Sequence, residues 1–186
     1  MSLLIGDEFT RILAAAQRGE EWAVAQLYRS LQPDVLRYLE SRDRAEAEDV
    51  AAQVWLEVAR GLGTFTGGEH EFRAFVFTIG RRRLLNARRG RVRRRADLVP
   101  VEMLAEVVVA SDDPAAAAAA RLDSRAAVER ISALLPAEQA EIVLLRVVAQ
   151  VSVEEVAEIV GKRPATIRVI QHRALRRLAK KLHEDR

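Results

Sequence analysis

Apolar residues recur every three or four positions along most of this chain, a spacing that is typical of amphipathic helices. In the first half of the chain the pattern covers residues 9–16, 24–39 and 47–58, and it opens again at 72–79. Pro33 lies inside the second stretch, so we expect it either to kink that helix or to restart it. Gly61 and Gly63 close the third stretch and lead into a loop at 64–70. These patterns predict an N-terminal bundle of helices.

The helical pattern lapses after Arg95 and returns near the C-terminus. The stretch between holds prolines, a weak apolar patch and an alanine run, which together are typical of a linker with a nascent helix at its end. Helical spacing resumes over 127–135, and Pro136 then begins another helix. The sequence therefore predicts an all-α protein of two small helical domains, residues 1–95 and 125–186, joined by a linker at 96–124.

A short helix with clear start and stop signals is predicted after Val151. Ser152 and Glu155 have the spacing of a capping box, in which each side chain accepts a hydrogen bond from the other residue's backbone N–H. Gly161 permits a sharp left-handed exit, and Pro164 suits the first turn of a following helix. This combination predicts a helix-turn-helix, although an ordinary helical hairpin is the simpler alternative.

The second helix of this unit has a basic face. Its apolar residues are expected to point inward: Ile167, Ile170, Ala174, Leu175, Leu178 and Leu182. The remaining side chains can read base edges when such a helix lies in the major groove of DNA. We therefore predict a DNA-binding face made of Arg163, Thr166, Arg168, Gln171, His172, Arg173 and Arg176.

Positive charge is unevenly distributed along the chain. The formal net charge is only +3, from 30 Lys and Arg against 27 Asp and Glu. Nine arginines nevertheless crowd residues 81–95 without an intervening acid, and a second basic group spans 162–181. Solvated helix faces are the simplest explanation of one such group, but two dense groups favour contact with a nucleic acid.

The sequence offers no support for an enzyme. The chain has no cysteine, which excludes disulfides and thiolate chemistry, and its three histidines are too scattered for a metal site or a catalytic triad. We expect no cofactor and no metal. No apolar run is long enough to span a bilayer and no signal peptide is evident, so a cytoplasmic protein without membrane insertion is expected.

Both halves resemble the extracytoplasmic-function sigma factors of bacterial RNA polymerase. Residues 131–182 resemble the family's fourth conserved region. In the N-terminal half, the family's second region is matched by Leu27-Tyr28, Val35-Leu36-Arg37-Tyr38-Leu39, Ala47-Glu48-Asp49-Val50 and Phe72-Arg73-Ala74-Phe75. The resemblance follows the family's order over nearly the whole chain.

The resemblance implies roles for particular residues. The helix that begins near Ala47 would bind core RNA polymerase through Asp49, Gln53, Leu56 and Glu57. The loop and helix after it would capture and melt the −10 promoter element through Phe65, Arg73, Thr78, Arg81, Arg82, Asn86, Arg88 and Arg89. Of the phenylalanines there, Phe72 and Phe75 have core spacing and Phe65 is the better candidate for exposure. The helix-turn-helix would bind the −35 duplex.

The resemblance also concerns the linker, the partners and base preference. The linker would run along the polymerase, where Asp112 and Asp113 either imitate phosphates or are ordinary solvated acids. An anti-sigma protein is a further candidate partner. Val169-Ile170 replaces a Ser-Arg pair that is frequent in the family, so the −35 preference has to come from this chain's own residues.

Two other functions remain as alternatives. A stand-alone regulator would use the helix-turn-helix without polymerase and would usually dimerise on a two-fold site, yet no dimerisation segment remains after the two domains are assigned. A protein-interaction module would use the basic helices to bind acidic partners. The sequence favours a sigma factor that directs promoter-specific initiation.

Overall fold

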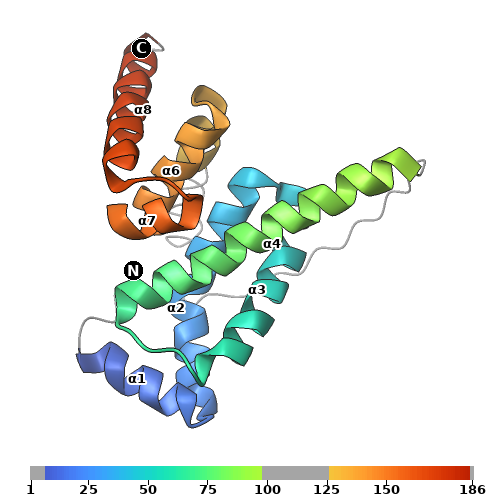
Figure 1. The fold of residues 1–186 in the computed structure, drawn as a ribbon, viewed down its shortest axis with the longest axis vertical. Coiled ribbons are helices and arrows are strands. Elements are labelled where there is room, and N and C mark those ends of the chain that lie inside the picture. The colour runs from blue at the N-terminus through green and yellow to red at the C-terminus, as the bar shows by residue number, and fades with distance from the viewer. Residues whose placement is uncertain (1–6, 98–125, 185–186) are drawn as a thin grey trace.

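The computed structural model describes residues 7–97 and 126–184, and these residues form helices joined by turns, with no strand among them (Figure 1). The all-α prediction is therefore confirmed. The expected linker at 96–124 lies, apart from residues 96 and 97, outside the described residues. None of the described helices is both long and apolar enough to cross a membrane.

The N-terminal half consists of α1 (Asp7–Gln17), α2 (Glu21–Arg42), the short 3₁₀ helix η1 (Arg44–Glu46), α3 (Ala47–Leu62) and α4 (Glu69–Asp97). α2 continues through Pro33, so the proline does not restart the helix. Pro33 is exposed, and as a proline it lacks the N–H that would have donated to the Arg29 carbonyl. The helix tolerates this loss because water can reach that side.

The C-terminal half contains a helix over residues 126–134, then α6 (Ala137–Val147), α7 (Val153–Val160) and α8 (Pro164–Glu184). The predicted capping box begins α7. The Glu155 N–H donates to Ser152 Oγ at 3.1 Å, and the Ser152 N–H donates to Glu155 Oε2 at 2.8 Å. Two of the N–H groups that a helix start leaves unpaired are thus satisfied.

A left-handed glycine sets the turn between α7 and α8. Gly161 has φ +71°, and its N–H donates to the Glu158 carbonyl at 3.3 Å. The Lys162 N–H donates to the Ala157 carbonyl at 2.8 Å, which completes a Schellman motif. A residue with a Cβ would be strained at this φ. The geometry confirms the predicted exit and directs the chain into Pro164, the first residue of α8.

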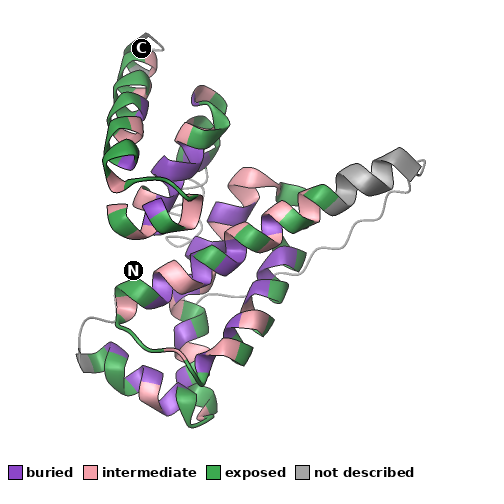
Figure 2. Cartoon of the chain, in the orientation of Figure 1, coloured by how far each residue is buried: buried purple, intermediate pink, exposed green. Residues whose placement is uncertain are grey.

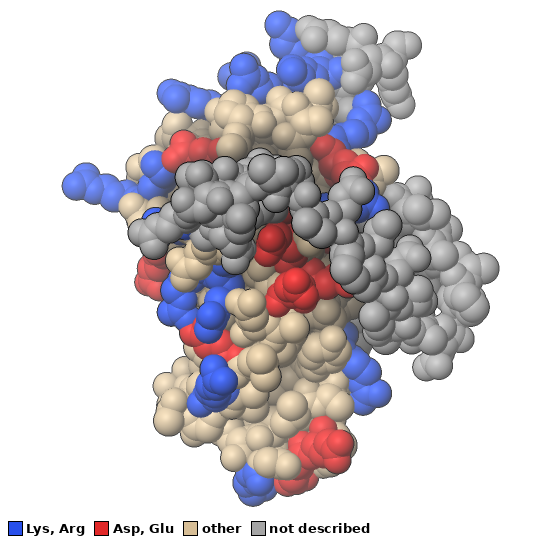
Figure 3. Space-filling view, turned by 90° about the vertical axis from the view of Figure 1, so that its right-hand side faces the viewer, with Lys and Arg blue, Asp and Glu red and all other residues tan. Residues whose placement is uncertain are grey.

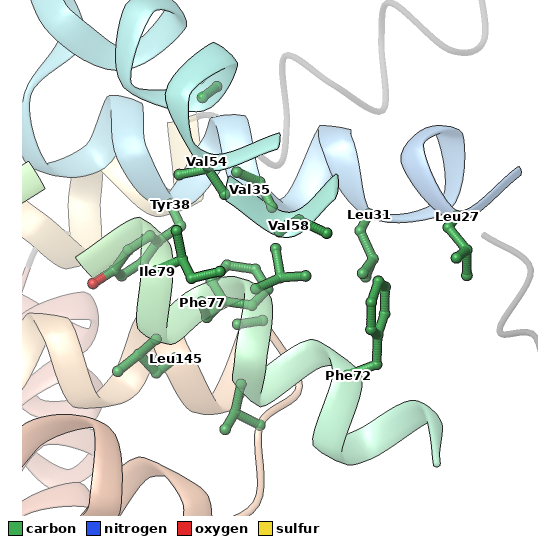
Figure 4. Close-up of a cluster of buried hydrophobic side chains, with 14 of the residues drawn as sticks. Leu27, Leu31, Val35, Tyr38, Val54, Val58, Phe72, Phe77, Ile79 and Leu145 are labelled. Atoms are coloured by element: carbon green, nitrogen blue, oxygen red, sulfur yellow. The ribbon is translucent and has the colours of Figure 1, made fainter. Parts of the chain in front are cut away.

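One apolar core joins the two halves. Buried residues line the facing sides of the helices in Figure 2, and the same cluster contains residues of α1–α4 together with residues of α6, α7 and α8. In Figure 4, Leu145 of α6 lies beside Phe77 of α4 and Tyr38 of α2. All three side chains are at most 1% exposed, so the contact between the two halves excludes water in the way the core of a single domain does.

α4 is the helix on which both halves pack. It contacts α2 and α3 of its own half and α7 of the other (Figure 1). The inward face predicted for α8 is largely confirmed, with Ile167 and Ala174 buried and Ile170 and Leu178 partly buried. The prediction is wrong for Leu175, which is 45% exposed. This residue lies at the edge of the apolar stripe, where no facing helix covers it.

Candidate nucleic-acid and polymerase interface

α8 presents a basic face on the side opposite the core. Ile167 and Ala174 have no exposed surface, and the period of 3.6 turns the other side of the helix toward solvent. Lys and Arg side chains gather at the top of Figure 3, the end of the molecule at which α8 finishes. Among the predicted −35 residues Gln171 is partly buried, and the exposed ones are Arg163, Thr166, Arg168, His172, Arg173 and Arg176.

Arg168 already has an intramolecular partner. Its Nη2 lies 2.6 Å from Glu154 Oε1, and both side chains are 60% exposed. An ion pair in such contact with water contributes little to stability. A phosphate or a base edge can therefore displace Glu154 from Arg168 at small cost.

A row of exposed side chains runs along one face of α4. Thr78, Arg82, Asn86 and Arg89 are spaced at i, i+4, i+8 and i+11, which places them on one face of the helix, and each is exposed. We call these residues the α4 row. They are half of the residues predicted to bind the −10 element.

Arg73, another predicted −10 residue, is buried instead. It is 4% exposed, and its Nη2 lies 2.7 Å from Asp34 Oδ2 in a pair whose two side chains are both nearly inaccessible. Its Nε donates to the carbonyl of Ala149, in the C-terminal half, at 2.8 Å. Asp34 also pairs with Arg37. In this arrangement Arg73 connects the two halves of the molecule and is not accessible to a phosphate.

Arg81 takes part in a second connection between the halves. Its Nε lies 3.1 Å from Glu141 Oε1 on α6, and the Tyr38 hydroxyl donates to the same oxygen at 3.3 Å. Burial, together with the negative charge of Glu141, raises the pKa of Tyr38 well above its usual value. The phenol therefore remains protonated and able to donate. Around the same contact, Arg42 Nη1 donates to the Ala137 carbonyl at 2.9 Å.

Arg82, Arg83 and Arg88 also have partners within the N-terminal half. Glu57 of α3 binds Arg82 with Oε1 and Arg83 with Oε2, the latter at 2.7 Å. Arg88 donates to the carbonyl of Arg42. Partial burial, and then the positive charge of Arg42, lower the pKa of the Arg88 guanidinium below its usual value. The arginine cluster is thus partly held by the protein itself.

Phe65 is less exposed than predicted. Its ring is partly buried and packs on Phe72 and Phe75, with ring centroids 5.3 and 5.4 Å apart. The loop is held in place because the Gly68 N–H donates to Glu71 Oε2 at 2.9 Å. Gly67 has φ +145°, and a Cβ there would lie 2.9 Å from the Cβ of Glu71, so this position requires glycine.

α3 leaves a mixed apolar and polar face uncovered. Val50, Val54 and Val58 are buried, whereas Asp49, Gln53 and Leu56 lie on the opposite face and are exposed. Leu56 is 59% exposed, more than the other large apolar side chains of the described residues. Glu57 is partly buried through its contacts with the α4 arginines. The exposed leucine with polar neighbours has the character of a protein-docking face.

Comparison with known proteins identifies both halves. The chain matches the family model for Sigma-70 region 2 over residues 27–94 and that for Sigma-70, region 4 over residues 125–178. It is 34% identical to the ECF RNA polymerase sigma factor SigD of Mycobacterium tuberculosis over 179 residues, which cover 93% of this chain and 83% of SigD. The chain belongs to the extracytoplasmic-function (ECF) sigma factor family.

Further relatives agree with this assignment. The sigma factor is 32% identical to the ECF RNA polymerase sigma factor ShbA of Streptomyces griseus over 183 residues, covering 92% of this chain and 95% of ShbA. Among solved structures, CnrH in complex with the cytosolic domain of CnrY matches with a TM-score of 0.64 at 20% identity, covering 96% of this chain and 99% of CnrH. That structural match supports the fold.

Family membership gives the general function. Sigma factors are non-catalytic initiation factors, and this one acts with RNA polymerase in promoter-specific transcription initiation. The alternative of a stand-alone regulator is not favoured. The described residues contain no cluster of side chains that could hold a metal ion.

The structure also reveals two residues of the sigma factor that sequence reasoning missed. Asp34 and Glu141 are 3% and 9% exposed, and both receive arginines from α4. Each acid directly precedes an apolar run of its helix, Val35-Leu36 or Ile142–Leu145, and an acid that is buried with such a run requires a partner of opposite charge. The sequence alone does not say which arginine that is, because the partners are 39 and 60 positions away.

Proposed function

We propose that this sigma factor docks on core RNA polymerase through α3, contacts the melted −10 element through α4 and the 64–70 loop, and reads the −35 duplex through α8. One observation carries the proposal: α3, α4 and α8 each bury one face and leave predicted contact residues exposed on another. The structural arrangement therefore offers three separate surfaces to three ligands.

Contact with the −35 element uses the exposed side of α8. A helix in the major groove presents arginine, glutamine and threonine to base edges, and the N–H groups at its N-terminus favour a phosphate. Arg163, Thr166, Arg168, Gln171, His172, Arg173 and Arg176 are the residues proposed for this contact.

Contact with the −10 element rests first on the α4 row. Single-stranded DNA is commonly held by a cationic groove beside aromatic side chains. The α4 row supplies exposed cations and polar groups, and the packed rings of Phe65, Phe72 and Phe75 lie at the start of the same helix. Arg73, Arg81 and Arg88 stay in the proposed set, but each would first have to leave the partners that hold it in this structure. The same holds for Arg82 of the α4 row, which would have to leave Glu57.

Docking on the polymerase uses Asp49, Gln53, Leu56 and Glu57. Leu56 supplies an apolar anchor at the centre of this surface. The protein would act inside the bacterial cell, where the polymerase is, and an anti-sigma protein is a candidate partner for the same surfaces.

Run-off transcription with purified core polymerase tests the proposal. Leu56→Asp should abolish core binding in a pull-down while leaving the helical circular dichroism unchanged. Arg176→Ala should weaken transcription only from promoters that need a −35 element. Specific binding of the chain alone to a palindrome, with no stimulation of core polymerase, would instead support a regulator.

Salt dependence tests the α4 row separately. Each phosphate contact that is lost should reduce the slope of log K against log salt by about 0.7 for single-stranded DNA. Arg89→Ala should therefore lower the affinity of the holoenzyme for a −10 single strand and flatten this slope. Arg11→Ala, at an exposed position of α1, is the matched control and should change neither. An unchanged slope in Arg89→Ala would argue against this contact.

A further inference from the structure

An apolar side chain stands at the centre of the basic face of α8. Val169 is 48% exposed. Residues 165, 169, 172 and 176 follow one another at i, i+4, i+7 and i+11, so Ala165, Val169, His172 and Arg176 form one exposed row. We call it the α8 row, and it faces away from buried Ile167 and Ala174.

Packing does not explain a valine at this position. The opposite side of α8 contacts α6 and α7, and Val169 is absent from the apolar clusters that those contacts form. Helix propensity does not explain it either, because a β-branched residue is a poorer helix former than alanine, lysine or glutamine. An exposed apolar residue alone is common on protein surfaces. This one, however, occupies the face that a recognition helix turns toward the bases.

The major groove offers one apolar feature for such a side chain. The edges of the base pairs carry mainly hydrogen-bond donors and acceptors, and the C5-methyl group of thymine is the apolar group that projects from them into the groove. Valine cannot donate or accept a hydrogen bond, so opposite a donor or acceptor it would leave a polar group unpaired. Opposite a thymine methyl it would remove two apolar surfaces from water.

We propose that Val169 determines specificity by contacting the methyl group of a thymine in the −35 element. This inference rests on the proposed function, in which α8 reads that element. It assigns the apolar part of the recognition to one side chain, whereas the neighbouring His172, Arg173 and Arg176 supply hydrogen bonds and charge.

Replacement of thymine by deoxyuridine tests the proposal, because it removes only the methyl group. Holoenzyme assembled from core polymerase and the full chain would first select active promoters from a library with a randomised −35 region. Each selected thymine would then be replaced singly by deoxyuridine in run-off transcription. Loss of one buried methyl contact should lower transcription about fourfold at one position.

Variants of Val169 link this effect to the side chain. Val169→Ala should lower transcription from the thymine promoter about fourfold and make thymine and deoxyuridine equivalent at that position. Val169→Ile should keep the discrimination. Leu175→Ala is the matched control, since Leu175 is 45% exposed on the same helix but lies outside the α8 row, and it should discriminate like the unchanged protein. Alanine at these exposed helical positions favours folding.

The outcomes separate the inference from the proposed function. Discrimination that persists in Val169→Ala, or the absence of any thymine at which deoxyuridine matters, would overturn the inference while −35 dependence remains. Equal transcription from selected and scrambled −35 sequences would overturn the proposed function and the inference together.

Discussion

At the scale of single residues, Asp34 influences the contact between the two halves of the molecule, although it lies in the middle of α2. Its carboxylate binds Arg37 and Arg73, and its side chain is only 4% exposed. A charge removed from water is costly unless it is paired, so Asp34 and Arg73 depend on one another. Since Arg73 also binds the Ala149 carbonyl, this pair orients the contact between the two halves.

Asp34→Ala should therefore destabilise the protein by about 3–5 kcal/mol, because it leaves the Arg73 guanidinium without its carboxylate in a buried site. The free energy of unfolding from urea titrations would measure this. Glu154→Ala removes an ion pair whose side chains are both 60% exposed and should cost less than about 1 kcal/mol. Similar losses in the two variants would contradict the role of burial.

Tyr38 makes stability sensitive to alkaline pH. Burial raises its pKa in the folded state above the value of about 10 in the unfolded chain. The resulting stabilisation is fully present below about pH 10 and is lost as the pH rises through the folded-state pKa. Tyr38→Phe removes the hydrogen bond to Glu141, so it should lower the free energy of unfolding at neutral pH. It should also flatten the decline of stability at alkaline pH. An equally steep decline in Tyr38→Phe would show that another group is responsible.

At the scale of elements, the sequence predicted best where the signals are local. The start of α7 at Ser152 and the turn at Gly161 depend on residues within one helical turn, and both were confirmed. The effect of Pro33 and the exposure of Leu175 depend on which neighbouring helix covers each residue. Periodicity along one helix does not contain that information.

The capping box of α7 is predicted to stabilise the helix-turn-helix. Ser152→Ala removes the acceptor for the Glu155 N–H and should cost about 1 kcal/mol. Ser30→Ala is the matched control, because Ser30 lies inside α2 and donates only to the Leu27 carbonyl one turn earlier. That exchange should be neutral or slightly stabilising, since alanine is the better helix former. Urea denaturation would compare the free energies of unfolding of the two variants, and equal losses would contradict a stabilising role of the cap.

At the scale of the whole molecule, the sequence predicted two domains and did not predict that they share a core. The apolar stripe of α6 was evident, but a stripe does not identify the helix that it meets. Here Ile142, Leu144 and Leu145 join the cluster built by α1–α4, and Glu141 meets Arg81 and Tyr38. The contact is formed by residues far apart in the chain, each with several conceivable partners.

This shared core predicts that the two halves unfold together. Both tryptophans, Trp22 and Trp55, lie in the N-terminal half, so their fluorescence reports that half alone, whereas far-UV circular dichroism reports all helices. The two signals should give coincident urea transitions in the unchanged protein.

Glu141→Lys should separate the two transitions, because it places a cation against Arg81 at a site where the glutamate is 9% exposed. Glu129→Lys disrupts the pair with Arg44, whose side chains are 61% and 68% exposed, and should keep the transitions coincident. Coincident transitions in Glu141→Lys at the original midpoint would show that the halves do not depend on this contact.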